Sequence, residues 1–293
     1  MADSIKVRIA IGSVLIVAIS GLIYLDHATG HGYGAIGIGT LVIAAALLEF
    51  GRMAATVAPV PTRTLALCGA LYALLKGLGY ELDPRLHHLT APLVVAFLYA
   101  VFFLALRGEP REERLRGLAL SVFGFVYLPW LAGFALDARF IAAAAPGYPP
   151  VGEAAFFYVI AIAKGTDICA YFAGKLTGKT KFVPSVSPGK TVAGFVGALA
   201  GGVLITAAFV QFSALGQVLP WPLVPGVGLV LALVVVSGDL IESFIKRSVA
   251  VKDSAALLPS FGGVLDIIDS IVIAAPPVYF LLRALPLLTG GKP

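Results

Sequence analysis

Charged residues are scarce in this sequence. Only 13% of its 293 residues are Asp, Glu, Lys or Arg, against about 25% in soluble domains, while 59% are hydrophobic and the mean hydropathy is +0.96. The two cysteines, Cys68 and Cys169, lie in apolar runs without metal-type spacing, so we expect packing residues rather than a disulfide or a metal site. Patterns typical of DNA or RNA binding are also missing, and we expect no nucleic-acid partner. The composition excludes a soluble domain and predicts an integral membrane protein.

Long apolar runs fill most of the chain. A helix needs about 20 residues to cross a bilayer, and nine runs approach that length, at about residues 9–25, 33–50, 62–80, 89–106, 115–136, 154–173, 191–213, 224–245 and 265–288. We therefore predict an all-α integral membrane protein with about nine transmembrane helices in one polytopic domain, residues 1–293. The run at 9–25 resembles a signal-peptide core, but no small-residue cleavage site follows it, so we interpret it as a retained span.

The distribution of cations predicts the orientation. Most of the 21 lysines and arginines fall at the N-terminus or in the even-numbered loops, whereas the opposite side carries Arg85, Arg139 and Lys292. The positive-inside rule then puts the N-terminus and the even loops in the cytoplasm. We expect residues 1–150 to supply N-terminal spans, and residues 151–293 to form a catalytic region with cytoplasmic loops at 174–190 and 246–264. The same bias suggests contact with anionic lipid of the bilayer surface.

Ionisable residues inside membrane spans are functional candidates. Lys164 and Asp167 are three residues apart in the sixth span, and Glu242 and Lys246 are four apart in the eighth. Each pair shares one face of its helix. Neutralising ion pairs that hold the bundle together are an equal alternative for these four residues.

Three further carboxylates have few cations close to them on the same helices. Asp239 lies in the eighth span, and Asp266 and Asp269 are three apart at the start of the ninth. Such carboxylates would repel each other unless a cation lay between them, and hard oxygen ligands suit Mg²⁺. We predict that Asp239, Asp266 and Asp269 bind Mg²⁺, and a second metal ion remains open.

The sixth loop has the composition of a phosphate-binding segment. AGKLTGKTKFVPSVSPGKT places Lys175, Lys179 and Lys190 among glycines and hydroxyl side chains. It is not a P-loop, because Pro184 stands where that motif requires glycine. Thr191 instead opens the next apolar helix, whose N-terminus could hold a phosphate.

The segment from Ser243 to Ser270 resembles the signature of the phosphatidate cytidylyltransferases, also called CDP-diacylglycerol synthases. Nine of its eleven single-residue positions are matched here, by Ser243, Lys246, Arg247, Lys252, Asp253, Gly262, Gly263, Asp266 and Asp269. Upstream, DICAYFAGKLTGK and SPGKTVAG are similar to two further segments of that family. The resemblance covers about Asp167 to Ser270, and the N-terminal half agrees only as membrane spans.

The resemblance implies transfer of a cytidylyl group from CTP to phosphatidate at the cytoplasmic face of the inner (plasma) membrane, with a homodimer left open. It implies a catalytic set of Asp239, Asp266, Asp269 and Lys252. The implied substrate-binding residues are Asp167, Lys175, Ser187, Lys190, Thr191, Ser243, Lys246, Arg247, Asp253, Gly262 and Gly263.

The chain departs from the family pattern at three positions. Phe261 replaces a histidine, Ile267 replaces an arginine and Ala193 replaces a glutamate. These changes put rate and substrate preference in doubt, but they leave the expected metal ligands in place. Two alternatives stay open: a CTP-dependent lipid-alcohol kinase, and an ion-coupled transporter with charged residues in its spans.

Overall fold

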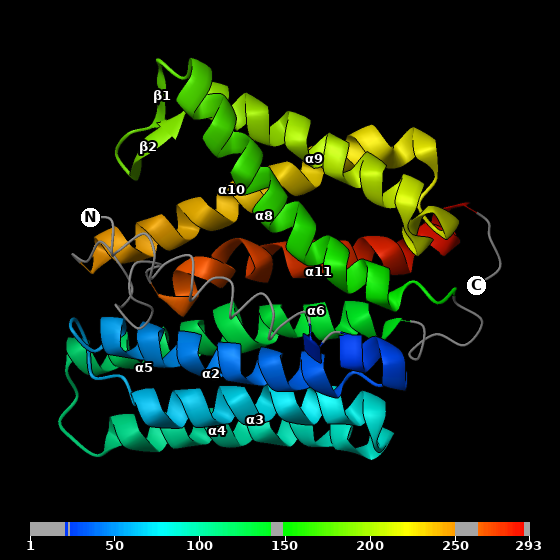
Figure 1. The fold of residues 1–293 in the computed structure, drawn as a ribbon. Helices are drawn as coiled ribbons and strands as arrows, with labels where there is room; N and C mark the ends of the chain where they lie inside the picture. Colours follow the sequence, from blue (N-terminus) through cyan, green and yellow to red (C-terminus); the bar gives the residue numbers. More distant parts are fainter. Residues whose placement is uncertain (1–20, 23, 142–148, 250–262, 290–293) are drawn as a thin grey trace. The chain divides into compact units, whose positions relative to one another are not determined.

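The computed structural model describes residues 21–22, 24–141, 149–249 and 263–289, and these are almost entirely helical (Figure 1). The helices are α2 (Tyr33–Ala54), α3 (Thr62–Glu81), α4 (Thr90–Leu106), α5 (Glu112–Phe125), α6 (Leu131–Arg139), α8 (Gly152–Thr177), α9 (Val192–Phe212), α10 (Val224–Ser248) and α11 (Val264–Thr289). Shorter elements are η1 (Pro84–Leu89), η2 (Val126–Trp130), η3 (Ala214–Gln217), η4 (Trp221–Leu223), β1 (Lys181–Val183) and β2 (Ser187–Thr191). The chain divides into two compact units, Met1–Trp130 with Val249–Ile267, and Leu131–Ser248 with Ile268–Pro293.

Seven helical stretches in the described part of the chain are long and apolar enough to cross a bilayer. The predicted all-α membrane fold is therefore confirmed. The predicted span at 62–80 forms helix α3, which is not among the seven; Arg63, Lys76 and Glu81 make it more polar than its neighbours. The predicted first span, 9–25, lies mostly outside the described residues, so the total of nine remains a prediction.

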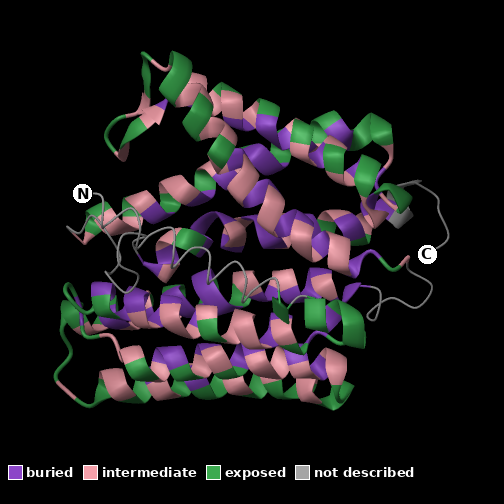
Figure 2. Cartoon of the chain, viewed as in Figure 1, coloured by how far each residue is buried: buried purple, intermediate pink, exposed green. Residues whose placement is uncertain are grey.

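In the first unit, α3 packs against α2 and α4, and α5 packs against α2. The Phe125 ring joins them: its centroid lies 4.6 Å from that of Phe97 on α4 and 5.6 Å from that of Tyr72 on α3. Helix α4 is mainly intermediate or exposed in Figure 2, and only Phe97 and Val101 on it are buried. An apolar helix with so much exposed surface suits contact with lipid chains.

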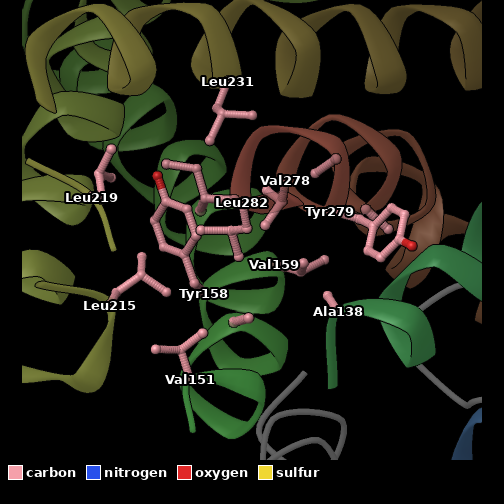
Figure 3. Close-up of a cluster of buried hydrophobic side chains, with 14 of the residues drawn as sticks. Ala138, Val151, Tyr158, Val159, Leu215, Leu219, Leu231, Val278, Tyr279 and Leu282 are labelled. Atoms are coloured by element: carbon pink, nitrogen blue, oxygen red, sulfur yellow. The ribbon is translucent and has the colours of Figure 1, made fainter. Parts of the chain in front are cut away.

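The second unit has its core around Tyr158 of α8 (Figure 3). This fully buried ring is surrounded by aliphatic side chains, and its hydroxyl lies 2.7 Å from the Thr206 hydroxyl on α9. Thr206 in turn donates to the Gly202 carbonyl at 2.7 Å. The Tyr158 and Thr206 hydroxyls thus satisfy each other inside the unit, as a low-dielectric interior requires. The labelled neighbours in Figure 3 are Ala138, Val151, Val159, Leu215, Leu219, Leu231, Val278, Tyr279 and Leu282.

The one β-sheet in the described residues is an antiparallel hairpin that the sequence analysis did not predict. Strands β1 and β2 lie beside the C-terminal end of α8 (Figure 1) and pair Lys181 with Thr191. Phe182 on β1 stacks on Phe195 of α9, with centroids 4.5 Å apart and planes 12° apart. This ring contact fixes the lysine-rich loop against the start of α9.

Candidate functional site: a carboxylate and lysine cluster

Three carboxylates from α10 and α11 form the centre of the candidate site, inside the second unit. One oxygen each of Asp239, Glu242 and Asp269 lies within 4.8 Å of the other two. Asp239 and Glu242 share one face of α10 because they are three residues apart. Glu242 and Asp269 are buried, with 2% and 4% exposure, while Asp239 is partly exposed. The cluster is therefore mostly closed off from solvent, but open at Asp239.

Gly238 allows the two helices to approach closely at this point. A Cβ atom at position 238 would lie 3.1 Å from the Ile273 Cβ and 3.4 Å from the Asp269 carbonyl oxygen of α11. Contacts of that length are tighter than normal packing. A side chain at 238 would therefore require Ile273 or one of the two helices to shift by a few tenths of an ångström.

A different lysine pairs with each carboxylate of the cluster. Lys164 on α8 lies 3.4 Å from Asp269, and Lys246 on α10 lies 2.7 Å from Glu242. Lys190 on β2 forms an ion pair with Asp239, and it also donates to the Val236 carbonyl at 3.3 Å. Burying several carboxylates together is costly unless cations compensate them. The three lysines supply that compensation from three separate elements.

Ser270 connects the cluster to Asp167. Its hydroxyl accepts from Lys164 at 2.7 Å, and it lies 3.1 Å from an oxygen of Asp167 and 3.1 Å from Asp269. Lys164 also lies 3.4 Å from Asp167. The expected ion pair between Lys164 and Asp167 is confirmed, but the same lysine serves Asp269 as well. One cation on α8 thus connects two carboxylates from different helices.

The hairpin supplies the loop cations at the start of α9. Thr191 is the N-cap of α9, as predicted, and its hydroxyl accepts from the Gly194 amide at 3.1 Å. Lys190 directly precedes it on β2, so one cation lies next to the positive end of the helix dipole. Lys175 lies at the end of α8, with its ammonium 5.6 Å from the Tyr171 ring centroid, and Lys179 is exposed. The predicted substrate residue Ser187 lies on β2.

The cluster fits a hard divalent cation. Its three potential ligand atoms are all carboxylate oxygens, the type that Mg²⁺, Ca²⁺ and Mn²⁺ prefer. Mg²⁺ usually binds through one or two carboxylates together with water and substrate phosphates. Partial exposure of Asp239 leaves a side on which such further ligands could enter.

The structure groups the predicted metal ligands differently from the sequence hypothesis. Among the described residues, Asp239 and Asp269 group with Glu242, and Asp266 is not a member. Asp266 instead accepts from the Gly263 amide at 3.0 Å, which caps the first turn of α11. Asp266 therefore stabilises the first turn of α11, the helix that carries Asp269.

The remaining predicted residues divide into two groups. Ser243 and Arg247 lie on α10, and Gly263 directly precedes α11. Three predicted residues fall outside the described part of the chain: Lys252, Asp253 and Gly262. Their roles stay predictions.

Sequence reasoning did not assign Glu242, Lys164 or Ser270 to the site. Glu242 was interpreted as a possible ion-pair partner of Lys246, and the structure shows both that ion pair and membership of the carboxylate cluster. The available signal was its spacing of three from Asp239. Ser270 follows Asp269 directly, but its contact with Lys164 spans 106 positions and leaves no local signal.

Comparison with known proteins identifies the family. The sequence matches the description "Cytidylyltransferase family" over residues 6–285. A phosphatidate cytidylyltransferase of Mycobacterium leprae (strain TN) is 34% identical over 186 residues, which make up 62% of this chain and 55% of that protein. One of Bacillus subtilis (strain 168) is 43% identical over 128 residues, or 43% of this chain and 46% of that protein.

These alignments place the similarity on part of each relative. A third relative, the phosphatidate cytidylyltransferase of Brucella suis biovar 1 (strain 1330), is 39% identical over 137 residues and is matched over 48% of its length. The chain spans about half the length of the curated relatives that it matches. The family match itself extends across both units described above. On that match, this all-α membrane protein belongs to the cytidylyltransferase family.

Proposed function

We propose that the chain is a phosphatidate cytidylyltransferase, which transfers a cytidylyl group from CTP to phosphatidate and releases diphosphate. The observation that carries the proposal is the carboxylate cluster of α10 and α11, in which each carboxylate pairs with a different lysine. Mixed charges of this kind suit a reaction between two anionic substrates. Relatives named phosphatidate cytidylyltransferase support the choice of CTP and phosphatidate.

In the proposed reaction, a phosphate oxygen of phosphatidate attacks the α-phosphorus of CTP. A new P–O bond forms there, and the bond from the α-phosphorus to the oxygen bridging the β-phosphate breaks, so diphosphate leaves with the electron pair. The attacking oxygen is already ionised near neutral pH, and no side chain has to remove a proton. A bound Mg²⁺ would supply charge neutralisation and orientation of the phosphates.

The lysines would change partners when substrates bind. With a divalent cation on the carboxylates, the ammonium groups no longer have to neutralise them and can approach phosphate oxygens. Lys190 is best placed for this, because it directly precedes the N-terminus of α9, where the positive end of the helix dipole favours an anion.

The site is proposed to face the cytoplasm from the inner (plasma) membrane. The excess of cations in the even-numbered loops supports this orientation, and the hairpin lies in one of those loops. CTP would then enter from water while phosphatidate stays in the adjoining leaflet.

The direct test is a product assay on the purified protein. Mixed micelles containing phosphatidate and Mg²⁺ receive each of the four nucleoside triphosphates, and both diphosphate and lipid products are measured. We expect CDP-diacylglycerol and equimolar diphosphate from CTP only. Asp239→Asn should abolish both, whereas Asp83→Asn, at the exposed N-cap of η1, should leave them unchanged.

Two results would overturn the proposal. Phosphorylation of a lipid alcohol with release of CDP would indicate a kinase, in which a hydroxyl replaces the phosphate as acceptor. Uptake of a labelled solute into proteoliposomes without CTP, together with no lipid product, would indicate a transporter.

A further inference from the structure

Glu49 is a fully buried carboxylate in the N-terminal half of the chain, within helix α2. Its two oxygens accept hydrogen bonds from the amides of Val264 and Leu265, each at 2.9 Å. These residues are the first two of α11, more than 200 positions later in the sequence. All three lie in the first compact unit.

The start of α11 depends on these bonds because its own sequence supplies little capping. The amides of a helix's first turn have no partner within the helix, and a glycine at position 263 has no side chain to accept from them. Asp266 accepts from the Gly263 amide at 3.0 Å. Glu49 satisfies the next two amides, so two carboxylates hold three successive backbone donors.

This contact precedes one carboxylate of the cluster, Asp269, along the continuous helix α11. Leu265 precedes Asp266 directly and Asp269 by four residues, or about one helical turn. A shift or loosening of the first turn therefore changes the position of Asp269. The negative charge of Glu49 also favours the positive end of the α11 dipole.

We infer that Glu49 is a positioning residue: it fixes the first turn of α11 and thereby the carboxylate of Asp269 in the metal-binding cluster. The inference rests on the proposed function for its effect on rate, but not for its effect on structure or metal binding. Glu49 acts through backbone amides, so it is not assigned as a metal ligand. Through Glu49, helix α2 would then influence the site by way of the first turn of α11.

The chain contains a matched control. Asp26 is also buried, at 6% exposure, and its two oxygens accept from the amides of Gly34 and Ala35, at 2.7 and 2.8 Å, in the first turn of α2. Ala35 and Glu49 are 14 residues apart on that helix, or about 21 Å at 1.5 Å per residue. Asp26→Asn thus removes the same kind of interaction at a different helix start.

The experiment compares Glu49→Gln and Asp26→Asn in the full-length purified protein by three measurements. Hydrogen exchange by mass spectrometry reports on the peptide spanning residues 264–270, electron paramagnetic resonance measures Mn²⁺ affinity without substrates, and the product assay gives kcat. Glu49→Gln should speed exchange in that peptide, weaken Mn²⁺ binding about 10-fold and lower kcat about 10-fold or more, the scale seen for groups that orient metal ligands. Asp26→Asn should leave all three unchanged and lower only the melting temperature.

Equal effects of both variants, or unchanged Mn²⁺ affinity in Glu49→Gln despite faster exchange, would refute the positioning role. A wild type that binds no Mn²⁺ would refute it as well. A wild type without CDP-lipid product, but with the expected exchange and Mn²⁺ differences, would support the positioning role and contradict the proposed function instead.

Discussion

Neutralising one carboxylate of the cluster should leave the protein equally or more stable while it abolishes activity. The Ser270 amide donates to an Asp269 oxygen at 2.6 Å, and in Asp269→Asn the side-chain amide keeps an oxygen that can accept this bond. Two carboxylates lie within 4.8 Å of Asp269, and each repels it by at least ~3.5 kcal/mol at an effective dielectric constant of 20. Lys164, at 3.4 Å, attracts it by ~5 kcal/mol on the same scale.

The balance of these terms makes the stability effect small. Removing the charge relieves ~7 kcal/mol of repulsion and loses ~5 kcal/mol of attraction to Lys164, and it also loses the longer-range attraction to Lys190 and Lys246, so the terms nearly cancel. Solvent near the partly exposed Asp239 and Lys164 screens every term, so we expect a melting temperature in EDTA that is unchanged or a few degrees higher. CDP-diacylglycerol formation should fall by two or more orders of magnitude, because a lost metal ligand should cost more than a lost second-sphere group.

The opposite substitution provides the control. Lys164→Gln removes the cation that pairs with Asp269, so it should lower the melting temperature in EDTA. Added Mg²⁺ should then raise the melting temperature of this variant by more than it raises that of the wild type. Thermal unfolding in detergent, with EDTA and then with Mg²⁺, measures both effects. If Asp269→Asn melts several degrees lower in EDTA and its activity falls only with the folded fraction, the cluster is a structural ion-pair network and the metal assignment is wrong.

Four further predictions test other parts of the structure. Chelation by EDTA should abolish turnover and added Mg²⁺ should restore it, and full activity in chelated buffer would contradict a metal site. Lys179→Gln should raise the apparent KM for CTP with kcat within about 2-fold, since an exposed cation gives mostly uniform binding, whereas Lys190→Gln should lower kcat as well. Thr206→Val should lower the free energy of unfolding by about 1–3 kcal/mol, because the buried Tyr158 hydroxyl loses its partner, and Tyr158→Phe should cost less. Ile267→Arg should not raise the initial rate, and a large gain would indicate that the missing signature arginine limits this chain.

The helices could be predicted because each apolar run of membrane-spanning length is bounded by charged or turn-forming residues. Thr191 is predicted as the start of a helix because an apolar run follows it, and the structure shows that its hydroxyl caps that helix. The hairpin before it was not predicted. Its strands have three and five residues, too short for an alternating pattern, and the contact between Phe182 and Phe195 that holds it is tertiary.

The candidate site was predictable only where spacing along one helix determines which residues meet. Asp239 and Glu242 share a face of α10 by their spacing of three, yet Lys246 lies on the same face, and spacing alone could not separate a ligand from an ion-pair partner. The structure shows that Glu242 contacts Lys246 and also belongs to the carboxylate cluster, because α11 brings Asp269 to the same side of α10. Which face of an apolar helix meets which neighbour is decided by packing, and small residues such as Gly238 only permit the approach.

Contacts between segments far apart in the sequence could not be predicted. One of them, between Lys164 and Asp269, explains how the chain can lack the arginine that the family pattern has at position 267. Ile267 lies where the family pattern has a cation, and this suggested reduced charge neutralisation beside Asp269. The structure shows that Lys164, which lies outside the three segments that resemble the family pattern, is already 3.4 Å from Asp269 and donates to Ser270. A second cation at 267 would have to be desolvated near the membrane edge, at up to ~2.5–3.5 kcal/mol if fully buried, with less negative charge left to offset that cost. Lys164 therefore gives a physical reason why the aspartates can keep their arrangement without the arginine, and why restoring it should not speed the reaction.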